Sequence, residues 1–352
     1  MNRRTVFLLA LIGGVGLLLY GLSGVLLPFV AGLLVAYFLD PVADRLESAG
    51  FSRTLATTVI TIAFFVLVAA VLTVLAPLLQ GQIVGLVAKT PTVVEALREQ
   101  AAPLIERFQA TLTQEQIARL REAAGTYAGE AAKLLGTMVG RVLSGGAAFL
   151  QLLSLVIITP LVSFYLLRDW DRIVAQFDDL LPRDMAPTVR EVMGEIDRTI
   201  AAWVRGQATV CLLLATWYGL GLTLVGLEFG LVIGFLTGLI SFVPYFGMGI
   251  GLAVALGVAF AQFSGVMPFV LVAGVFAVGQ VVEGYVLTPK LVGDKVGLHP
   301  VWVIFALLAG GALFGFTGVL LAVPVAAVIG VLLRHALARY RASAYWRGEG
   351  RS

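Results

Sequence analysis

Charged residues are scarce in this chain. Asp, Glu, Lys and Arg make up 13% of its 352 residues, whereas hydrophobic residues make up 59%. An ordinary soluble domain carries about a quarter charged residues. Several apolar runs also exceed the roughly 18 residues that indicate a transmembrane helix. The composition excludes a typical soluble protein and predicts an all-α integral membrane protein that crosses the bilayer several times.

Residues that usually carry catalysis or bind metals are scarce as well. The sequence has one cysteine, Cys211, which excludes an intrachain disulfide, and two histidines, His299 and His335. It has no HExxH or GxSxG motif, and the LSGG tetrapeptide at 143–146 comes without a phosphate-binding loop. We therefore expect no enzyme activity, no cofactor and no metal centre. If the protein transports a solute, an ion gradient rather than ATP should drive it.

The apolar runs set the expected number of helices. They lie at 5–22, 25–39, 54–79, 146–167, 206–226, 229–243, 249–264, 266–287, 301–314 and 316–333. Three of them, 229–243, 249–264 and 301–314, are rich in glycine and shorter than the roughly 20 residues of a straight span. We expect about eight transmembrane helices, with 229–264 and 301–333 folded as broken or re-entrant helical hairpins.

Two polar segments, 80–145 and 168–205, interrupt the apolar runs. In both, apolar residues recur at helical spacing, which predicts amphipathic helices. We expect segment 80–145 to assemble subunits into a homo-oligomer. Two alternatives would bury the same apolar helix faces: the segment could pack on itself, or it could lie on the membrane surface. The predicted divisions are N-terminal transmembrane helices at 1–79, an extracytoplasmic segment at 80–145, a transmembrane helix at 146–167, cytoplasmic helices at 168–205, a transport core at 206–340 and a basic tail at 341–352.

Basic residues predict the orientation in the membrane. With the N-terminus in the cytoplasm, the short outer loops carry no Lys or Arg, whereas Arg3, Arg4 and the arginines after residue 333 are cytoplasmic. This pattern favours a bacterial inner-membrane protein with both termini in the cytoplasm. The basic charge then anchors the chain to membrane lipids, and we expect no nucleic-acid binding. The apolar N-terminus lacks a clear cleavage site, so we expect a retained first helix.

Glycines and a proline mark a helix break and close packing. Pro244, Gly247 and Gly249 predict a break, because proline removes a backbone donor and disrupts its helix. Backbone carbonyls freed at such a break can bind an ion or a polar solute. GxxxG pairs, which let helix backbones approach closely, occur at Gly234/Gly238, Gly247/Gly251 and Gly311/Gly315.

Glu283 lies near the end of an apolar run, with Gln280 one turn before it and Tyr285 after it. A charge at the bilayer centre costs about 2.5–3.5 kcal/mol on insertion scales, so such a carboxylate usually faces a cavity or a partner. Two interpretations stay open. Glu283 is either an interfacial acid paired with Lys290 or Lys295, or a carboxylate in the transport path that exchanges a proton or a monovalent cation.

Several blocks of the chain resemble the autoinducer-2 exporter family of bacterial membrane proteins. They are "LLPFVAGLLVAYFLDPVADRLESAGFSRTLA", "ITPLVSFYLLRDWDRI", "WVRGQ", "GLISFVPYFGMGIG" and "VEGYVLTPKLVGDKVGLHPVWVIFALLAGGALFGFTGVLLAVPVAAVI". Met248 departs from the family pattern, which often has proline there. The resemblance implies about eight transmembrane helices and transport. The candidate gate or coupling residues within these blocks are Arg205, Gln207, Pro289, Lys290, Asp294 and Lys295.

Three functions remain as hypotheses. The first is a gradient-driven secondary transporter that exports a small polar solute, with autoinducer-2 as the substrate that the resemblance implies. The second is a sodium or lithium/proton antiporter, which the resemblance also allows. The third is a membrane scaffold that transports nothing and binds partners through its polar segments.

Overall fold

The described part of the chain is helical throughout. The computed structural model describes residues 20–74, 146–244, 246–292 and 299–343, with isolated positions at 14, 16–18, 77, 81, 82, 85 and 346. Within these ranges no strand occurs, which confirms the all-α prediction. The start of the predicted first helix, most of segment 80–145, Asp294, Lys295 and most of the basic tail lie outside the described residues.

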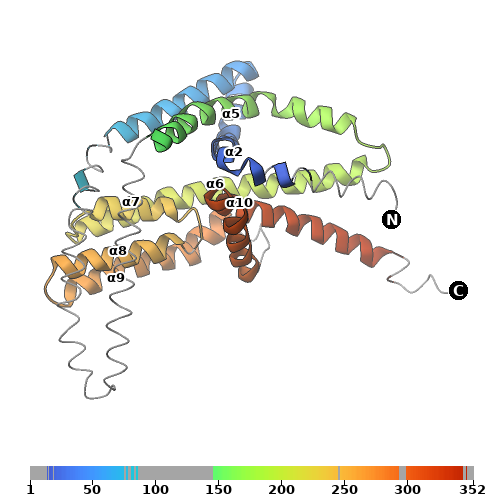
Figure 1. Cartoon of the computed structure of the whole chain (residues 1–352). Helices are drawn as coiled ribbons and strands as arrows, with labels where there is room; N and C mark the ends of the chain where they lie inside the picture. Colours follow the sequence, from blue (N-terminus) through green and yellow to red (C-terminus); the bar gives the residue numbers. More distant parts are fainter. Residues whose placement is uncertain are drawn as a thin grey trace. The chain divides into compact units, whose positions relative to one another are not determined.

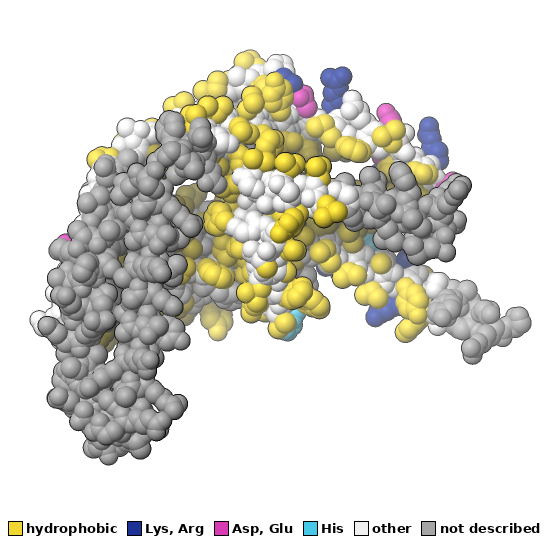
Figure 2. All heavy atoms as spheres, in the orientation of Figure 1, with side chains coloured by type: hydrophobic (Ala, Val, Ile, Leu, Met, Phe, Trp, Pro, Cys, Tyr) yellow, Lys and Arg dark blue, Asp and Glu magenta, His cyan; other side chains and the backbone are white. Residues whose placement is uncertain are grey.

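Six described helices are long and apolar enough to cross a membrane. They cover Ser23–Ser48, Arg53–Val74, Leu153–Asp179, Ala186–Leu224, Met267–Leu291 and Pro300–Ala342. Many of their large hydrophobic side chains are exposed, and Figure 2 shows hydrophobic side chains on the surface of the described part of the chain. Exposed apolar patches of this extent mark contact with lipid or another protein. The fold is that of a multi-pass helical membrane protein.

The chain divides into two compact units. Unit 1 comprises Met1–Val66, Leu153–Thr209 and Leu287–Ser352, and unit 2 comprises Leu67–Leu152 and Val210–Val286. In unit 1, α2 (Leu26–Ser48) packs against α5 (Gly146–Asp179) through a buried apolar cluster. The cluster consists of Ala36, Leu39, Ala43 and Leu167.

Hydroxyl groups of α5 reinforce this contact. Thr159 donates a hydrogen bond to the backbone carbonyl of Pro28 at 3.3 Å, and Ser163 donates to that of Gly32 at 3.0 Å. Both hydroxyls are buried. Because small side chains and interhelical hydrogen bonds hold membrane helices together in the absence of a hydrophobic driving force, this pairing fixes α5 against α2.

The polar segment 168–205 continues the neighbouring helices. Its first part is the end of α5, and its second part is the start of α6 (Ala186–Leu224), which runs for 39 residues without interruption. A short turn at 180–185 joins the two. The helices predicted for this segment are therefore present, as extensions of membrane-spanning helices and not as separate elements.

Glycines bring α6 and α7 (Gly230–Ile240) into close backbone contact within unit 2. A Cβ atom built at Gly230 would lie 2.8 Å from the Leu222 carbonyl carbon. One built at Gly234 would overlap the backbone of Tyr218. Side chains larger than hydrogen do not fit at these positions, so the packing role predicted for the Gly234/Gly238 pair is confirmed.

The two helices α7 and α8 (Phe246–Gln262) form a hairpin, and Figure 1 shows α8 between α7 and α9. A Cβ atom at Gly247 or Gly251 of α8 would overlap Ser241 or Thr237. With 11 residues, α7 is about 17 Å long, well short of a bilayer core of about 30 Å. The hairpin predicted at 229–264 is confirmed.

A second hairpin lies within α10 (Pro300–Ala342). The helix is interrupted at Gly315, whose φ of 57° and ψ of −140° are not helical and suit glycine. A Cβ atom built at Gly310 would lie 2.5 Å from the carbonyl oxygen of Gly318, so the arms before and after Gly315 pack backbone to backbone. They can be followed near the α10 label in Figure 1. The hairpin predicted at 301–333 is confirmed.

One glycine role needs correction. Gly315 was expected to pack as half of a GxxxG pair, but a Cβ atom there would meet nothing within 4 Å. Its function is conformational, because the reversal of the chain requires a positive φ at this position.

Replacing Gly234 should test the glycine contact between α6 and α7. We expect Gly234→Ala to lower the free energy of unfolding in detergent by about 1–3 kcal/mol, because the added methyl group overlaps the α6 backbone. Gly274→Ala on α9 is the matched control, since its methyl group meets open space. Equal unfolding curves for the two variants would contradict the account of this contact.

Candidate functional site

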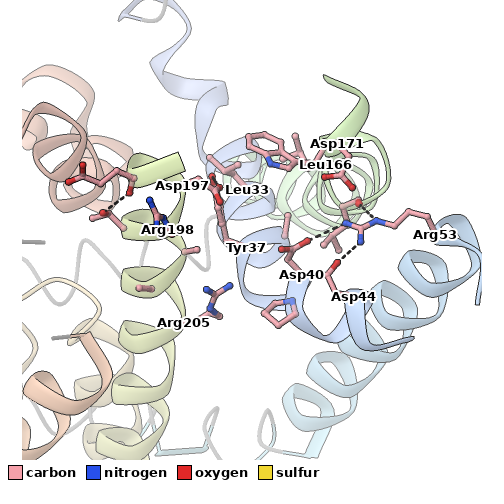
Figure 3. A pocket seen from close by; sticks show the side chains of 18 residues that line it. Leu33, Tyr37, Asp40, Asp44, Arg53, Leu166, Asp171, Asp197, Arg198 and Arg205 are labelled. Carbon is pink, nitrogen blue, oxygen red and sulfur yellow. Dashed lines mark hydrogen bonds and ion pairs between the residues drawn. The ribbon is translucent and has the colours of Figure 1, made fainter. Parts of the chain in front are cut away.

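A cavity of about 790 Å³ lies among α2, the helix Arg53–Val74, α5 and α6 in unit 1 (Figure 3). Small-molecule sites usually measure about 300–1,000 Å³. The charged lining residues are Asp40, Asp44, Asp171, Glu195, Asp197, Arg53, Arg198 and Arg205. Five carboxylates thus face three guanidinium groups, a formal excess of two negative charges. A cavity whose lining carries a net charge concentrates ions of the opposite charge, which are cations in this case.

Arg53 organises one wall of this cavity. Its guanidinium group lies 2.6 Å from Asp44, 3.2 Å from Asp40 and 3.2 Å from Glu47, and it also donates to the backbone carbonyl of Leu167 at 3.0 Å. The arginine side chain is only 17% exposed. A single cation therefore joins three helices and balances part of the charge of three carboxylates. Hydrogen bonds between charged groups are among the stronger ones, so this contact should stabilise the arrangement of the helices.

Another part of the lining combines aromatic rings and an acid. The Tyr37 hydroxyl donates a hydrogen bond to Asp197 at 3.0 Å. The ring of Tyr37 meets that of Trp170 edge to face, with centroids 6.0 Å apart. Figure 3 shows Tyr37 and Asp197 facing each other from α2 and α6, with Arg205 on α6 beside the cavity.

The acidic lining residue Glu195 is held from α10. Arg334 lies 2.9 Å from one carboxylate oxygen of Glu195, and His335 lies 3.6 Å from the other. These contacts connect α6 with the far arm of α10 inside unit 1. They leave Glu195 less available to a ligand than Asp171, for which no ion pair occurs among the described residues.

Of the residues that line this cavity, Arg205 was the one singled out as a candidate from the sequence. Glu283 was singled out as an acid near the end of an apolar run, but Asp40 likewise directly follows Leu39 at the end of the run 25–39. That adjacency was the available signal for Asp40. Gln207, the other candidate on this stretch of α6, is buried two residues after Arg205.

A second candidate site lies in unit 2 around Glu283. Glu283 follows α9 (Met267–Val282) and opens η2 (Glu283–Val292), a π-helical segment that contains Pro289. Segments of π-helix are rare and often occur at functional sites. The helix therefore changes type at Glu283.

Glu283 is half-buried, while Gln280 and Tyr285 are exposed. The Glu283 carboxylate has no hydrogen bond or ion pair among the described residues, and its charge acts on Tyr218 and Cys211 of α6. Because the carboxylate is half-buried without a neutralising partner among the described residues, it is a candidate for a functional acid.

Of the predicted break residues, Pro244 lies in the turn between α7 and α8, whereas Gly247 and Gly249 lie in the first turn of α8. Gly247 is buried against Ser241, which makes it a packing residue, whereas Gly249 is exposed and has open space around it. Their predicted part in an ion or solute pathway stays a prediction.

The predicted gate is described only in part. Pro289 and Lys290 lie in η2 and are exposed, while Asp294 and Lys295 lie outside the described residues. A pairing of Glu283 with either lysine stays a prediction. Within the described ranges, no three His, Cys, Asp or Glu side chains are arranged to hold a metal ion.

Comparison with known proteins agrees with this architecture. A sequence model of the family described as "AI-2E family transporter" matches residues 6–338. YrrI of Bacillus subtilis (strain 168), named as a candidate transport protein, is 29% identical over 316 residues, which cover 89% of this chain and 87% of YrrI. PerM of Escherichia coli (strain K12), named as a candidate permease, is 28% identical over 325 residues, which cover 92% and 90%.

The fold and these matches define a multi-pass membrane protein that acts in transport. The chain belongs to the AI-2E transporter family.

Removing the Arg53 guanidinium should destabilise unit 1. We expect Arg53→Gln to lower the free energy of unfolding by about 1–3 kcal/mol, because it leaves three carboxylates close together without their shared cation. Arg190→Gln is the control, since its ion pair with Asp178 is exposed to solvent and should contribute little to the free energy of unfolding. Thermal unfolding in detergent measures both, and an Arg53→Gln protein as stable as the control would contradict this role.

Proposed function

We propose that this protein is a gradient-driven secondary transporter of the bacterial inner membrane, with both termini in the cytoplasm. It exports a small polar solute, with autoinducer-2 as the first substrate to test, and it works as a homo-oligomer. Membership of the AI-2E transporter family supports the transport role. The absence of a phosphate-binding loop from the sequence favours an ion gradient as the energy source.

The observation that carries the proposal is the position of Glu283. It is a half-buried carboxylate in a membrane-spanning helix, at a change of helix type, without an ion pair among the described residues. A carboxylate in such a place can hold a proton in one state of the transporter and release it in another. Glu283 is therefore our candidate for the group that couples the proton gradient to solute movement.

Glu283→Gln tests this role in proteoliposomes. Under an imposed proton gradient, we expect it to lower flux by about tenfold or more, because the amide keeps the shape of the side chain but cannot exchange a proton. A pH-sensitive dye inside the vesicles reports proton movement. Export is measured as movement of autoinducer-2 across the vesicle membrane. The unfolding temperature and oligomer size should match those of the parent protein.

Glu228→Gln is the matched control for this experiment. Glu228 lies in the turn before α7, where its backbone N–H donates to the Gln262 side chain at 2.7 Å. The variant should transport at the parental rate. A parental rate in Glu283→Gln as well would defeat the coupling role, and an absence of flux in the parent protein would favour the scaffold hypothesis.

The cavity of unit 1 favours cation/proton antiport as a second candidate function. Its formal excess of two negative charges would raise the local concentration of sodium or lithium ions. If cations enter through this cavity, Asp171 assists their capture, since it has no ion pair among the described residues.

Asp171→Asn tests the cavity. We expect the sodium concentration that gives half-maximal proton exchange to rise by about twofold, with a smaller rise at high ionic strength, where surface charge is screened. Asp184→Asn, in the exposed turn between α5 and α6, is the control. Identical sodium dependence for both variants would remove the cavity from the cation path.

A further inference from the structure

The hydroxyl group of Tyr218 is buried without a hydrogen-bond partner among the described residues. Tyr218 is 0% exposed, and its ring stacks on Phe276 of α9, with ring centroids 4.8 Å apart and 22° between the planes. A buried tyrosine hydroxyl usually finds a partner, because leaving it unpaired destabilises the folded state. A partner from outside the protein would explain why this position carries a hydroxyl.

The backbone of α9 passes directly beside this hydroxyl. A Cβ atom built at Gly279 would lie 2.7 Å from the hydroxyl oxygen of Tyr218. Glu283 lies one turn after Gly279 on the same face of the helix, and long side chains on a helix lean toward its N-terminus. The Glu283 charge acts on Tyr218, which agrees with a carboxylate close to the hydroxyl.

Cys211 adds a third polar group to this region. It lies two turns before Tyr218 on α6, it is buried, and the Glu283 charge acts on it as well. Other buried side chains of these two helices, such as Leu214 and Val272, are apolar. The carboxylate, the phenol and the thiol are thus polar groups of this region, whereas the Trp217 N–H of α6 already donates to the backbone carbonyl of Val275 on α9 at 3.0 Å.

We propose that Tyr218 and Glu283 together bind a hydronium ion that carries the coupled proton. The hydronium would donate hydrogen bonds to the phenol oxygen and to the carboxylate. Its proton passes to the carboxylate, which leaves a neutral water molecule on Tyr218, and the reverse step returns the proton to water. No other bond changes. A calcium or magnesium ion takes about six or more oxygen ligands, whereas these two side chains supply three oxygen atoms.

This inference rests on the proposed function, and Tyr218→Phe tests it separately. The full-length variant is reconstituted in proteoliposomes, and proton flux under an imposed gradient is followed with an internal pH-sensitive dye. We expect flux about tenfold or more below that of the parent, because one hydrogen bond to the hydronium is lost. The unfolding temperature should be unchanged or higher, because the variant also removes a buried, unpaired hydroxyl.

Thr61→Val is the matched control. Thr61 carries the other buried hydroxyl without a partner among the described residues, on the helix Arg53–Val74 of unit 1. Its replacement should likewise leave the unfolding temperature unchanged or higher, but with parental flux. The contrast separates loss of a hydroxyl in general from loss of the one beside Glu283.

Several outcomes would overturn the inference. Parental proton flux in Tyr218→Phe removes the hydroxyl from the proton path, and a lower unfolding temperature shows that it has a structural partner. If Tyr218→Phe slows the exchange of autoinducer-2 measured in the absence of a gradient but leaves proton flux unchanged, Tyr218 binds the solute and not hydronium. If Glu283→Gln transports protons at the parental rate, both the coupling role of Glu283 and the site shared with Tyr218 are wrong. If Glu283→Gln loses proton flux but Tyr218→Phe keeps the parental flux, only the shared site is wrong.

Discussion

Close backbone contact between α6 and α7 is the interaction on which the arrangement of unit 2 depends. Lipid tails are as apolar as leucine, so membrane helices associate through packing and not through the hydrophobic effect. Gly230, Gly234 and Gly238 remove the side chains that would hold α7 away from α6. This contact fixes the Tyr218 backbone on one side, while Phe276 and Gly279 of α9 enclose its ring on the other.

The two units treat their charges in different ways. In unit 1, Arg53 joins three carboxylates and Arg334 holds Glu195, so each of these acids has a cationic partner on a neighbouring helix. In unit 2, Glu283 has no such partner among the described residues. An ion pair holds helices together and is lost only at considerable cost, whereas an unpaired half-buried acid is free to change its protonation state. The pairing pattern therefore supports a structural role for Arg53 and agrees with the coupling role proposed for Glu283.

Hydropathy and residue size were enough to predict much of the fold. Long apolar runs predicted the membrane-spanning helices, and the short glycine-rich runs predicted both hairpins. A helix of 11 residues is too short to span the bilayer, and glycine lets the chain reverse and pack closely against the preceding helix. The role of Gly315 was wrong, because spacing alone does not distinguish a packing glycine from one that needs a positive φ. The helices of 168–205 were expected as separate elements, because charge marks the end of an apolar run and not the end of a helix.

The candidate sites were less accessible from the sequence. Glu283 stood out because an acid in an apolar run is rare. Tyr218 did not, because a tyrosine within the run 206–226 has the pattern of an ordinary buried aromatic residue, and its unpaired hydroxyl appears only once α9 is packed against it. The charged cavity was missed for a similar reason. It gathers residues from helices far apart in the chain, and their meeting depends on tertiary contacts that local patterns do not contain.

The central claim is that the region around Glu283 takes part in gradient-driven transport. Cys211 offers a direct measurement without any substitution, because it is the only thiol in the chain and lies buried in this region. The measurement is its rate of reaction with a small, membrane-impermeant thiol reagent in proteoliposomes, with and without an imposed proton gradient. The account predicts slow labelling at rest and faster labelling under the gradient, as the site opens to water during transport. Equal rates under both conditions, in vesicles that do transport, would contradict it.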